Sequence, residues 1–539
     1  MQPRWSAACA AILMVFCAAP LGACIRDEGI LAFHAWQADG VAGMVEKTAT
    51  ATSPALLKAS APLAPANPEK PHVANNVSDH DDATLGPDWA SAHLQAKEEV
   101  AMSLSLTLLG SVTVNSALLY LVNSSNENIK RATWDILGGA GGIFCSVLLF
   151  ESWQQAEELV AEVVFLVTMP KVVSGLFNFV LAVAIVQIPL RRILDRPVHV
   201  AGWSHVGSHI IGFWGMNTFG SLIATLGEQP VFSDWPALCF VGVVASAASI
   251  FGVSLLAKVM RMHVYAGADA ADVHRAEHWG HQCEHIEDEF SGFIVGFLIT
   301  LVTRHCITMQ MPDLHGSPGH KTAQQVIGLL AAAGCSLVLQ LLVSQRAQAL
   351  KDLSPAMHRY FHTVLEIVTM TTGWMCHYAA TWYFWNLNQF FTRGMGPHMA
   401  VELVTATAAC QMGAAMCVAL LFSALAFVLV MAISITTHYT ETSTAHSIVK
   451  ALVIGVGLSW EKAFYVAIDS VSSEFESRNT HDTVGIALKL ILVSIVLPAW
   501  MFHILPRSIS GHGPHEHCGG DGCEREKLAR EELQGSSHG

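Results

Sequence analysis

Apolar stretches that are long enough to cross a bilayer recur along the chain from residue 101 onward, separated by short polar segments. A membrane-spanning helix needs about 20 predominantly apolar residues. Eleven stretches reach about that length: 101–122, 132–150, 159–188, 203–226, 235–257, 290–308, 323–343, 361–385, 401–433, 447–468 and 483–505. The pattern predicts an all-α, polytopic membrane protein whose residues 101–505 form about 11 transmembrane helices.

The composition agrees with this pattern. Hydrophobic residues make up 52% of the 539 residues and charged residues only 13%, whereas a soluble domain carries about 25% charged residues. This excludes an ordinary soluble enzyme and a disordered chain, and it makes the lipid bilayer the expected partner. The net charge of −14 is not that of a nucleic-acid-binding protein.

The N-terminal segment is typical of an exported protein. Arg4 precedes the apolar run 7–18, which is too short to cross a bilayer, so we predict that residues 1–23 are a signal peptide. Residues 24–100 then form an exported flexible arm, because 45–95 are rich in Ala, Pro, Thr, Ser and Asp. A lipobox ending at Cys24 and an uncleaved first anchor remain alternatives.

The loop charges predict the orientation of the protein. If the N-terminus is exported, 15 Lys and Arg residues lie in cytoplasmic loops and in a cytoplasmic tail formed by residues 506–539, against only four in the loops on the opposite side. The positive-inside rule favours that arrangement. The alternative is twelve spans with an uncleaved first segment.

Five of the predicted helices share a spacing in which a polar residue precedes a glycine by seven residues. The pairs are Asp135 with Gly142, His205 with Gly212, Glu289 with Gly296, Glu366 with Gly373, and Lys450 with Gly457. Seven residues are two helical turns, so both members of a pair share one helix face. The pattern indicates repeated two-helix units whose glycines pack against neighbouring helices. The alternative is coincidence, since glycine is common in membrane helices.

Ionisable residues inside predicted spans are candidates for an ion or proton path. Lys171 lies about 12 residues into the third stretch, with Asn178 on the same face. Glu366, Thr369 and His377 follow one face of the eighth stretch. The alternative is that such groups form structural pairs. For Glu461 and Lys489 a salt bridge between adjacent spans suffices, and for His205 and His209 we expect snorkelling toward the membrane surface.

Histidine is abundant, with 27 residues, and two predicted cytoplasmic clusters resemble metal-binding segments. One has His274, His278, His281 and His285 on a single helix face, and the tail contains His512, His515, His517, Cys518 and Cys523. Imidazole and thiolate are ligands that suit Zn²⁺. Neither cluster has a zinc-finger spacing, so solvated segments without metal are the alternative.

Two short segments resemble a known group of proteins. They are Asn123-Ser124-Ser125-Asn126-Glu127 through Trp134 with Ile143–Phe150, and Gly457–Phe464. Both are similar to uncharacterised multi-pass membrane proteins of dinoflagellate-type algae. The resemblance implies a eukaryotic signal peptide rather than a lipobox, and it carries no activity, ligand or site residue.

These observations favour a transporter or channel for a small ion, with a divalent metal as the named candidate. The alternative is a non-transporting membrane scaffold or receptor-like protein, in which the buried charges are packing pairs. No Walker A loop, dinucleotide-binding fingerprint, nucleophile elbow or HExxH motif occurs in the sequence. We therefore assign no catalytic residue and rank a membrane-embedded enzyme third.

Overall fold

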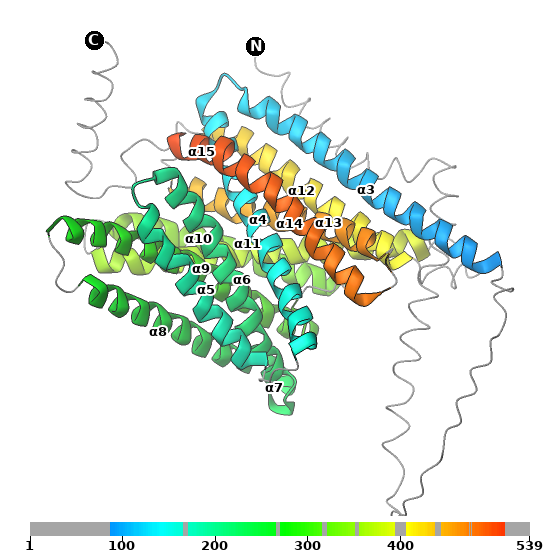
Figure 1. The fold of residues 1–539 in the computed structure, drawn as a ribbon, viewed down its shortest axis with the longest axis horizontal. Coiled ribbons are helices and arrows are strands. Elements are labelled where there is room, and N and C mark those ends of the chain that lie inside the picture. Colours follow the sequence, from blue (N-terminus) through cyan, green and yellow to red (C-terminus); the bar gives the residue numbers. More distant parts are fainter. Residues whose placement is uncertain are drawn as a thin grey trace, which may run out of the picture.

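The computed structural model describes residues 87–164, 171–265, 270–314, 321–350, 355–393, 406–436, 443–473, 475 and 477–511. All secondary structure in these ranges is helical (Figure 1), which confirms the predicted all-α class. Ten of the described helices are long and apolar enough to cross a membrane. The predicted signal peptide and most of the exported arm lie outside the described residues, as does the tail from residue 512.

Eleven long helices build the described part of the chain. They are α3 Pro87–Val122, α4 Glu127–Val164, α5 Lys171–Ile193, α6 Pro197–Gly227, α8 Cys239–Tyr265, α9 Ala270–Thr308, α10 Ala323–Leu350, α11 Pro355–Arg393, α12 Ala406–Thr436, α13 Ser443–Ser472 and α14 Arg478–Ala499. Short elements connect or extend them: α7 Pro230–Asp234, η1 Pro236–Leu238, the π-helical turn η4 Trp500–Ile504 and α15 Leu505–Gly511.

The third predicted stretch, 159–188, is corrected by the structure. Helix α4 continues to Val164, and α5 begins at Lys171. The prediction treated one uninterrupted apolar run as a single helix, although its first residues extend the preceding helix. Lys171 therefore opens α5 instead of lying near the middle of a span.

Five helices form a closed ring. Helix α4 packs against α6, α6 against α9, α9 against α11, α11 against α13, and α13 against α4 again. These are the five helices that carry the polar-to-glycine spacing. Contacts at two levels along α9 and α11, Gly292 with Glu366 and Gly296 with Met370, have the same sequence offset, so these two helices run parallel.

The remaining long helices surround the ring (Figure 1). Buried residues make up 61–72% of the spans in α4, α6, α9 and α13, but 22–39% of those in α3, α5, α8, α10, α12 and α14. Large apolar side chains such as Val241 and Phe251 of α8 and Leu339 of α10 are exposed. An apolar outer surface of this kind suits contact with lipid.

Helix α11 is as long as the others but is not among the ten candidate spans. It packs against α9, α10, α12 and α13, and its sequence is rich in Thr, His and aromatic residues. A helix enclosed by four neighbours exposes little surface to lipid, so it tolerates a more polar composition.

Candidate ion pathway inside the helix ring

Equivalent positions of the five ring helices form levels along the ring. His205, Glu289, Glu366 and Lys450 form what we call the ionisable tier. Eight residues further on, about 12 Å along a helix, the apolar tier consists of Ile143, Phe213, Phe297, Trp374 and Leu458. Beyond the apolar tier lies a polar cavity. Polar groups thus occur on both sides of an apolar layer.

The ionisable tier is held by contacts between different helices. Lys450 Nζ lies 2.7 Å from Glu366 Oε2, and His205 Nδ1 lies 3.4 Å from Glu289 Oε1. Lys450 also interacts electrostatically with Glu289. Asp135, the fifth residue of the recurring pattern, differs from the others because its carboxylate accepts a hydrogen bond from Ser508 of α15.

Helix α9 distributes four acidic residues to different neighbours. Glu284 contacts Lys258 and Arg359, and Asp288 also contacts Arg359. Glu287 lies 2.6 Å from the guanidinium of Arg261. Glu289 instead faces the ring, where it contacts His205 and accepts a hydrogen bond from Ser208. The arginine and lysine partners of the other three acids come from α8, outside the ring, and from the neighbouring ring helix α11.

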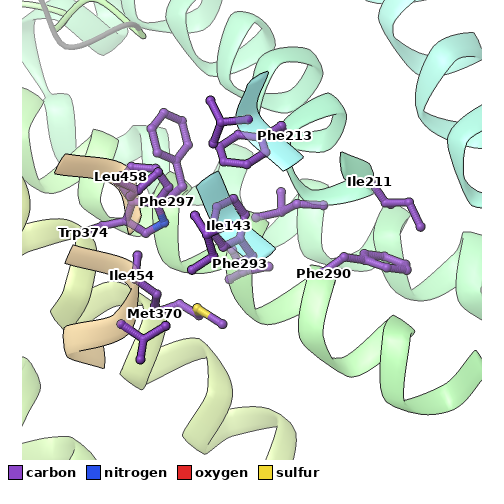
Figure 2. Close-up of a cluster of buried hydrophobic side chains, with 14 of the residues drawn as sticks. Ile143, Ile211, Phe213, Phe290, Phe293, Phe297, Met370, Trp374, Ile454 and Leu458 are labelled. Atoms are coloured by element: carbon purple, nitrogen blue, oxygen red, sulfur yellow. The ribbon is translucent and has the colours of Figure 1, made fainter. Parts of the chain in front are cut away.

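The apolar tier fills the middle of the ring. Figure 2 shows its five side chains gathered from separate helices, with Phe293 and Met370 beside them. Phe293 and Phe297 both lie edge-on to Trp374, at 5.3 Å between ring centroids. All five residues belong to one buried hydrophobic cluster. The layer is packed by side chains, so the ring axis is closed at this level.

The five glycines of the recurring pattern lie against the next helix around the ring. A Cβ atom at Gly296 would meet Met370 Cβ and the Thr371 backbone nitrogen at 2.8 Å, and one at Gly373 would meet the Ala451 carbonyl at 2.8 Å. Gly142 lies against His205, Gly212 against Phe293, and Gly457 against Ile143. Each glycine therefore contacts the ring helix that comes next in the chain, and Gly457 of α13 closes the ring against α4.

A cavity of about 340 Å³ opens beyond the apolar tier. Phe213, Phe297, Trp374 and Leu458 form its apolar floor. Its polar walls include Glu151, Glu158, His377, Glu461, Lys462 and Lys489. A second cavity of about 330 Å³, between α3, α4, α12 and α13, is lined mainly by apolar side chains, so it suits a hydrocarbon chain better than an ion.

The ion pair predicted between Glu461 and Lys489 is corrected by the structure. Lys489 Nζ lies 2.8 Å from Glu151 Oε2 and donates to Gln155 Oε1 at 3.3 Å. Glu461 is buried, and it interacts electrostatically with Glu151, Lys462 and Lys489. Glu151 was missed because the predicted second stretch stops at residue 150, whereas α4 continues to Val164.

Basic and aromatic residues pack behind Tyr378, which lines the cavity. The Arg304 guanidinium, on a side chain that is 1% exposed, lies 3.9 Å from the centre of the Tyr378 ring. Lys321, just before α10, lies over the Trp382 ring. Burial lowers the pKa of Lys321, and the neighbouring Arg304 lowers it further. Such cation–π contacts hold cations beside apolar walls.

His205, His209 and Glu289 bring three potential metal ligands together. Their ligand atoms all lie within 4.8 Å of one another, and this is the group of at least three such residues found in the described part of the chain. The sequence analysis placed the two histidines at the membrane surface, yet His209 is only 2% exposed. The four-residue spacing of the two histidines could have indicated a shared metal. Glu289 could not be added to them from the sequence, because it lies 80 residues further along the chain.

The other predicted site residues have varied surroundings. Asn178 donates to Glu157 between α5 and α4, outside the ring, whereas Glu366 lies in the ionisable tier and His377 lines the cavity. Thr369 is buried on α11.

The predicted metal-binding face of α9 exposes three of its histidines, His278, His281 and His285. Of these, His285 interacts electrostatically with Glu289 and Lys450. Metal binding by the α9 face and by the tail stays a prediction.

Comparison with known protein families, curated proteins and solved structures found no match for this chain. The geometry of the ring therefore carries the functional argument.

Proposed function

We propose that the protein moves a small cation across a membrane along the axis of the helix ring. The observation that carries this proposal is the alternation of levels within one closed ring: ionisable groups, an apolar layer, then a polar cavity. Ionisable residues inside a membrane are costly, and they mark ion paths when they face a bundle interior or a water-filled space.

The sign of the charge favours a cation over an anion. The cavity walls carry Glu151, Glu158 and Glu461 against Lys462 and Lys489. The ionisable tier carries Glu289 and Glu366 against Lys450. With histidine neutral, carboxylates exceed ammonium groups at both levels, and carboxylates attract cations in such sites.

The apolar tier is the closed gate in this proposal. Hydrophobic constrictions stop ions because a narrow apolar passage loses its water. Phe297 and Trp374 are at most 4% exposed and contact each other, so a side-chain or helix rearrangement must precede each passage. The excess of predicted cytoplasmic Lys and Arg places the ionisable tier toward the cytoplasm.

Tracer flux into liposomes containing the purified full-length protein tests the proposal. We expect uptake of a cation such as Zn²⁺ or K⁺ above that of protein-free liposomes, without comparable uptake of Cl⁻. Glu461→Gln should reduce the flux severalfold, because it removes a carboxylate from the cavity wall. Glu228→Gln is the matched control, since Glu228 is exposed beyond the end of α6.

If no cation enters above the protein-free level, the proposal fails. The ion pairs of the ring would then be packing pairs, and the scaffold alternative would account for them. Chloride uptake in place of cation uptake would contradict the charge argument.

A further inference from the structure

We infer that His205, His209 and Glu289 form a binding site for a borderline divalent transition-metal ion such as Zn²⁺. The inference deepens the proposed function by naming a cation and its site at the ionisable end of the ring, and it rests on that function only where it concerns transport. Two imidazoles and a carboxylate are a donor set typical of zinc and other first-row transition metals.

A hydrogen bond fixes the tautomer of the His209 ring. Its Nδ1 lies 2.8 Å from the His205 backbone carbonyl oxygen. A carbonyl oxygen only accepts hydrogen bonds, so Nδ1 carries the proton. In a neutral ring the lone pair then lies on Nε2. Metal-binding histidines have this arrangement, in which a hydrogen bond from the second nitrogen fixes the tautomer.

The contact between His205 and Glu289 also calls for a cation or a proton. His205 Nε2 lies 3.3 Å from the Gly139 carbonyl oxygen, so this nitrogen is the donor. The other nitrogen, Nδ1, lies 3.4 Å from Glu289 Oε1. In a neutral ring two acceptors would then face each other. Either a proton on Nδ1 or a bound metal ion between the two atoms removes this conflict.

Neighbouring side chains support the three ligands. Ser208 donates to Glu289 Oε2 at 2.7 Å and so fixes the carboxylate. Trp500, in the π-helical turn η4, stacks on His205 at 6.1 Å between ring centroids, and its indole nitrogen donates to the Gly138 carbonyl. On the opposite side Phe293 lies edge-on to His209 at 5.3 Å. The site therefore lies directly beside the apolar core of the ring.

Metal binding depends on access to the site from solvent and on the charged side chains around it. The His205 side chain is 24% exposed, which leaves a route to the site from the ionisable end. Lys450 interacts electrostatically with Glu289 and His209 and opposes a divalent cation, but Glu366 lies 2.7 Å from its ammonium and offsets that charge. Zinc lies about 2.0–2.2 Å from nitrogen and oxygen ligands, so separations of up to 4.8 Å must shorten when the metal binds.

Cobalt(II) binding by the purified full-length protein tests the inference, with visible absorption reporting the ligand field. The predicted ligands of the tail and of the α9 face are first removed within the full chain by nine substitutions: His512→Ala, His515→Ala, His517→Ala, Cys518→Ala, Cys523→Ala, His274→Ala, His278→Ala, His281→Ala and His285→Ala. We expect one Co²⁺ per chain, with ligand-field bands of a four- or five-coordinate nitrogen and oxygen site. The charge-transfer band of a thiolate ligand should be absent.

Variants in that background identify the ligands. His209→Gln and Glu289→Gln should each weaken Co²⁺ binding by more than the roughly 10–100-fold that loss of an outer hydrogen-bond partner costs, and Ser208→Ala should fall within that range. His263→Ala, at an exposed position on α8, is the matched control and should bind as the parent does. His205→Gln, at a partly exposed ligand, is the second variant if a buried substitution prevents folding.

Failure to bind Co²⁺ in this background, or unchanged binding by both His209→Gln and Glu289→Gln, overturns the inference. The binding experiment needs no transport, so the two proposals fail separately. Cation flux without Co²⁺ binding would remove the metal site and leave the proposed function. Co²⁺ binding without flux of any cation would keep the metal site and remove the proposed function.

Discussion

Buried ionisable side chains in this bundle balance one another in small groups, and the cavity wall offers a clear case. Lys489 is only 2% exposed, and it faces the carboxylates of Glu151 and Glu461. Its ammonium also lies 4.7 Å from the centre of the Tyr465 ring. One cation thus serves two acidic groups, so its removal leaves uncompensated negative charge in a buried site.

Lys489→Met should therefore destabilise the protein strongly. Removing one partner of a buried ion pair costs about 3–5 kcal/mol, and thermal unfolding of the purified protein in detergent measures the loss. Lys130→Met is the control, because Lys130 pairs with Glu127 on an exposed helix face and such pairs contribute about 0–1 kcal/mol. Equal unfolding midpoints for Lys489→Met and the parent would contradict this reading of the cavity.

The sequence alone identified single residues where a charged side chain falls inside an apolar stretch. Glu366, Glu461 and Lys489 stood out because charge is costly inside an apolar stretch. Their pairings were not predictable, because Lys450, Glu151 and Gln155 lie far away in the sequence and meet these residues only through helix packing. The grouping of Glu289 with His205 and His209 was missed for the same reason.

At the scale of elements, the recurring unit is a helix pair with an inner and an outer member. Outer helices α5, α8, α10 and α12 each pack against the inner helix that follows in the chain, and α14 packs against α4. The sequence predicted these helices and their glycines because hydrophobic runs and two-turn spacings are local signals. Their closure into a ring was not predictable, since it depends on which glycine faces which neighbour.

The close approach of α9 and α11 depends on Gly296. Gly296→Ala places a Cβ 2.8 Å from a backbone nitrogen, which a side-chain rotation cannot relieve, and such overpacking costs about 1–3 kcal/mol. Gly334→Ala is the matched control on α10, where a Cβ meets nothing within 4 Å. There the better helix propensity of alanine should stabilise by up to about 1 kcal/mol. Thermal unfolding that ranks Gly296→Ala at or above Gly334→Ala would contradict close packing at this position.

At the scale of the whole molecule, the ring has two chemically different ends, and their orientation in the membrane follows from loop charge. Tags at residues 60 and 535 should be accessible from opposite sides, because 15 Lys and Arg residues lie in the predicted cytoplasmic loops and tail and four in the loops of the opposite side. Protease protection of tags in sealed vesicles measures this. Protection of both tags on the same side would contradict eleven spans and favour the twelve-span alternative.

In the proposed function ions pass through the apolar tier, and one substitution tests this path. Trp374→Ala removes the indole that contacts Phe293 and Phe297 in the ring. Trp385→Ala, a matched truncation further along α11, removes a buried indole that packs with Ala414 instead.

Cation tracer flux through the purified protein in liposomes is the measurement. The account predicts a severalfold rise in flux for Trp374→Ala and no rise for Trp385→Ala, because only the first change widens the apolar constriction. Unchanged flux in a folded Trp374→Ala variant, or an equal rise in both variants, would contradict a path through the ring.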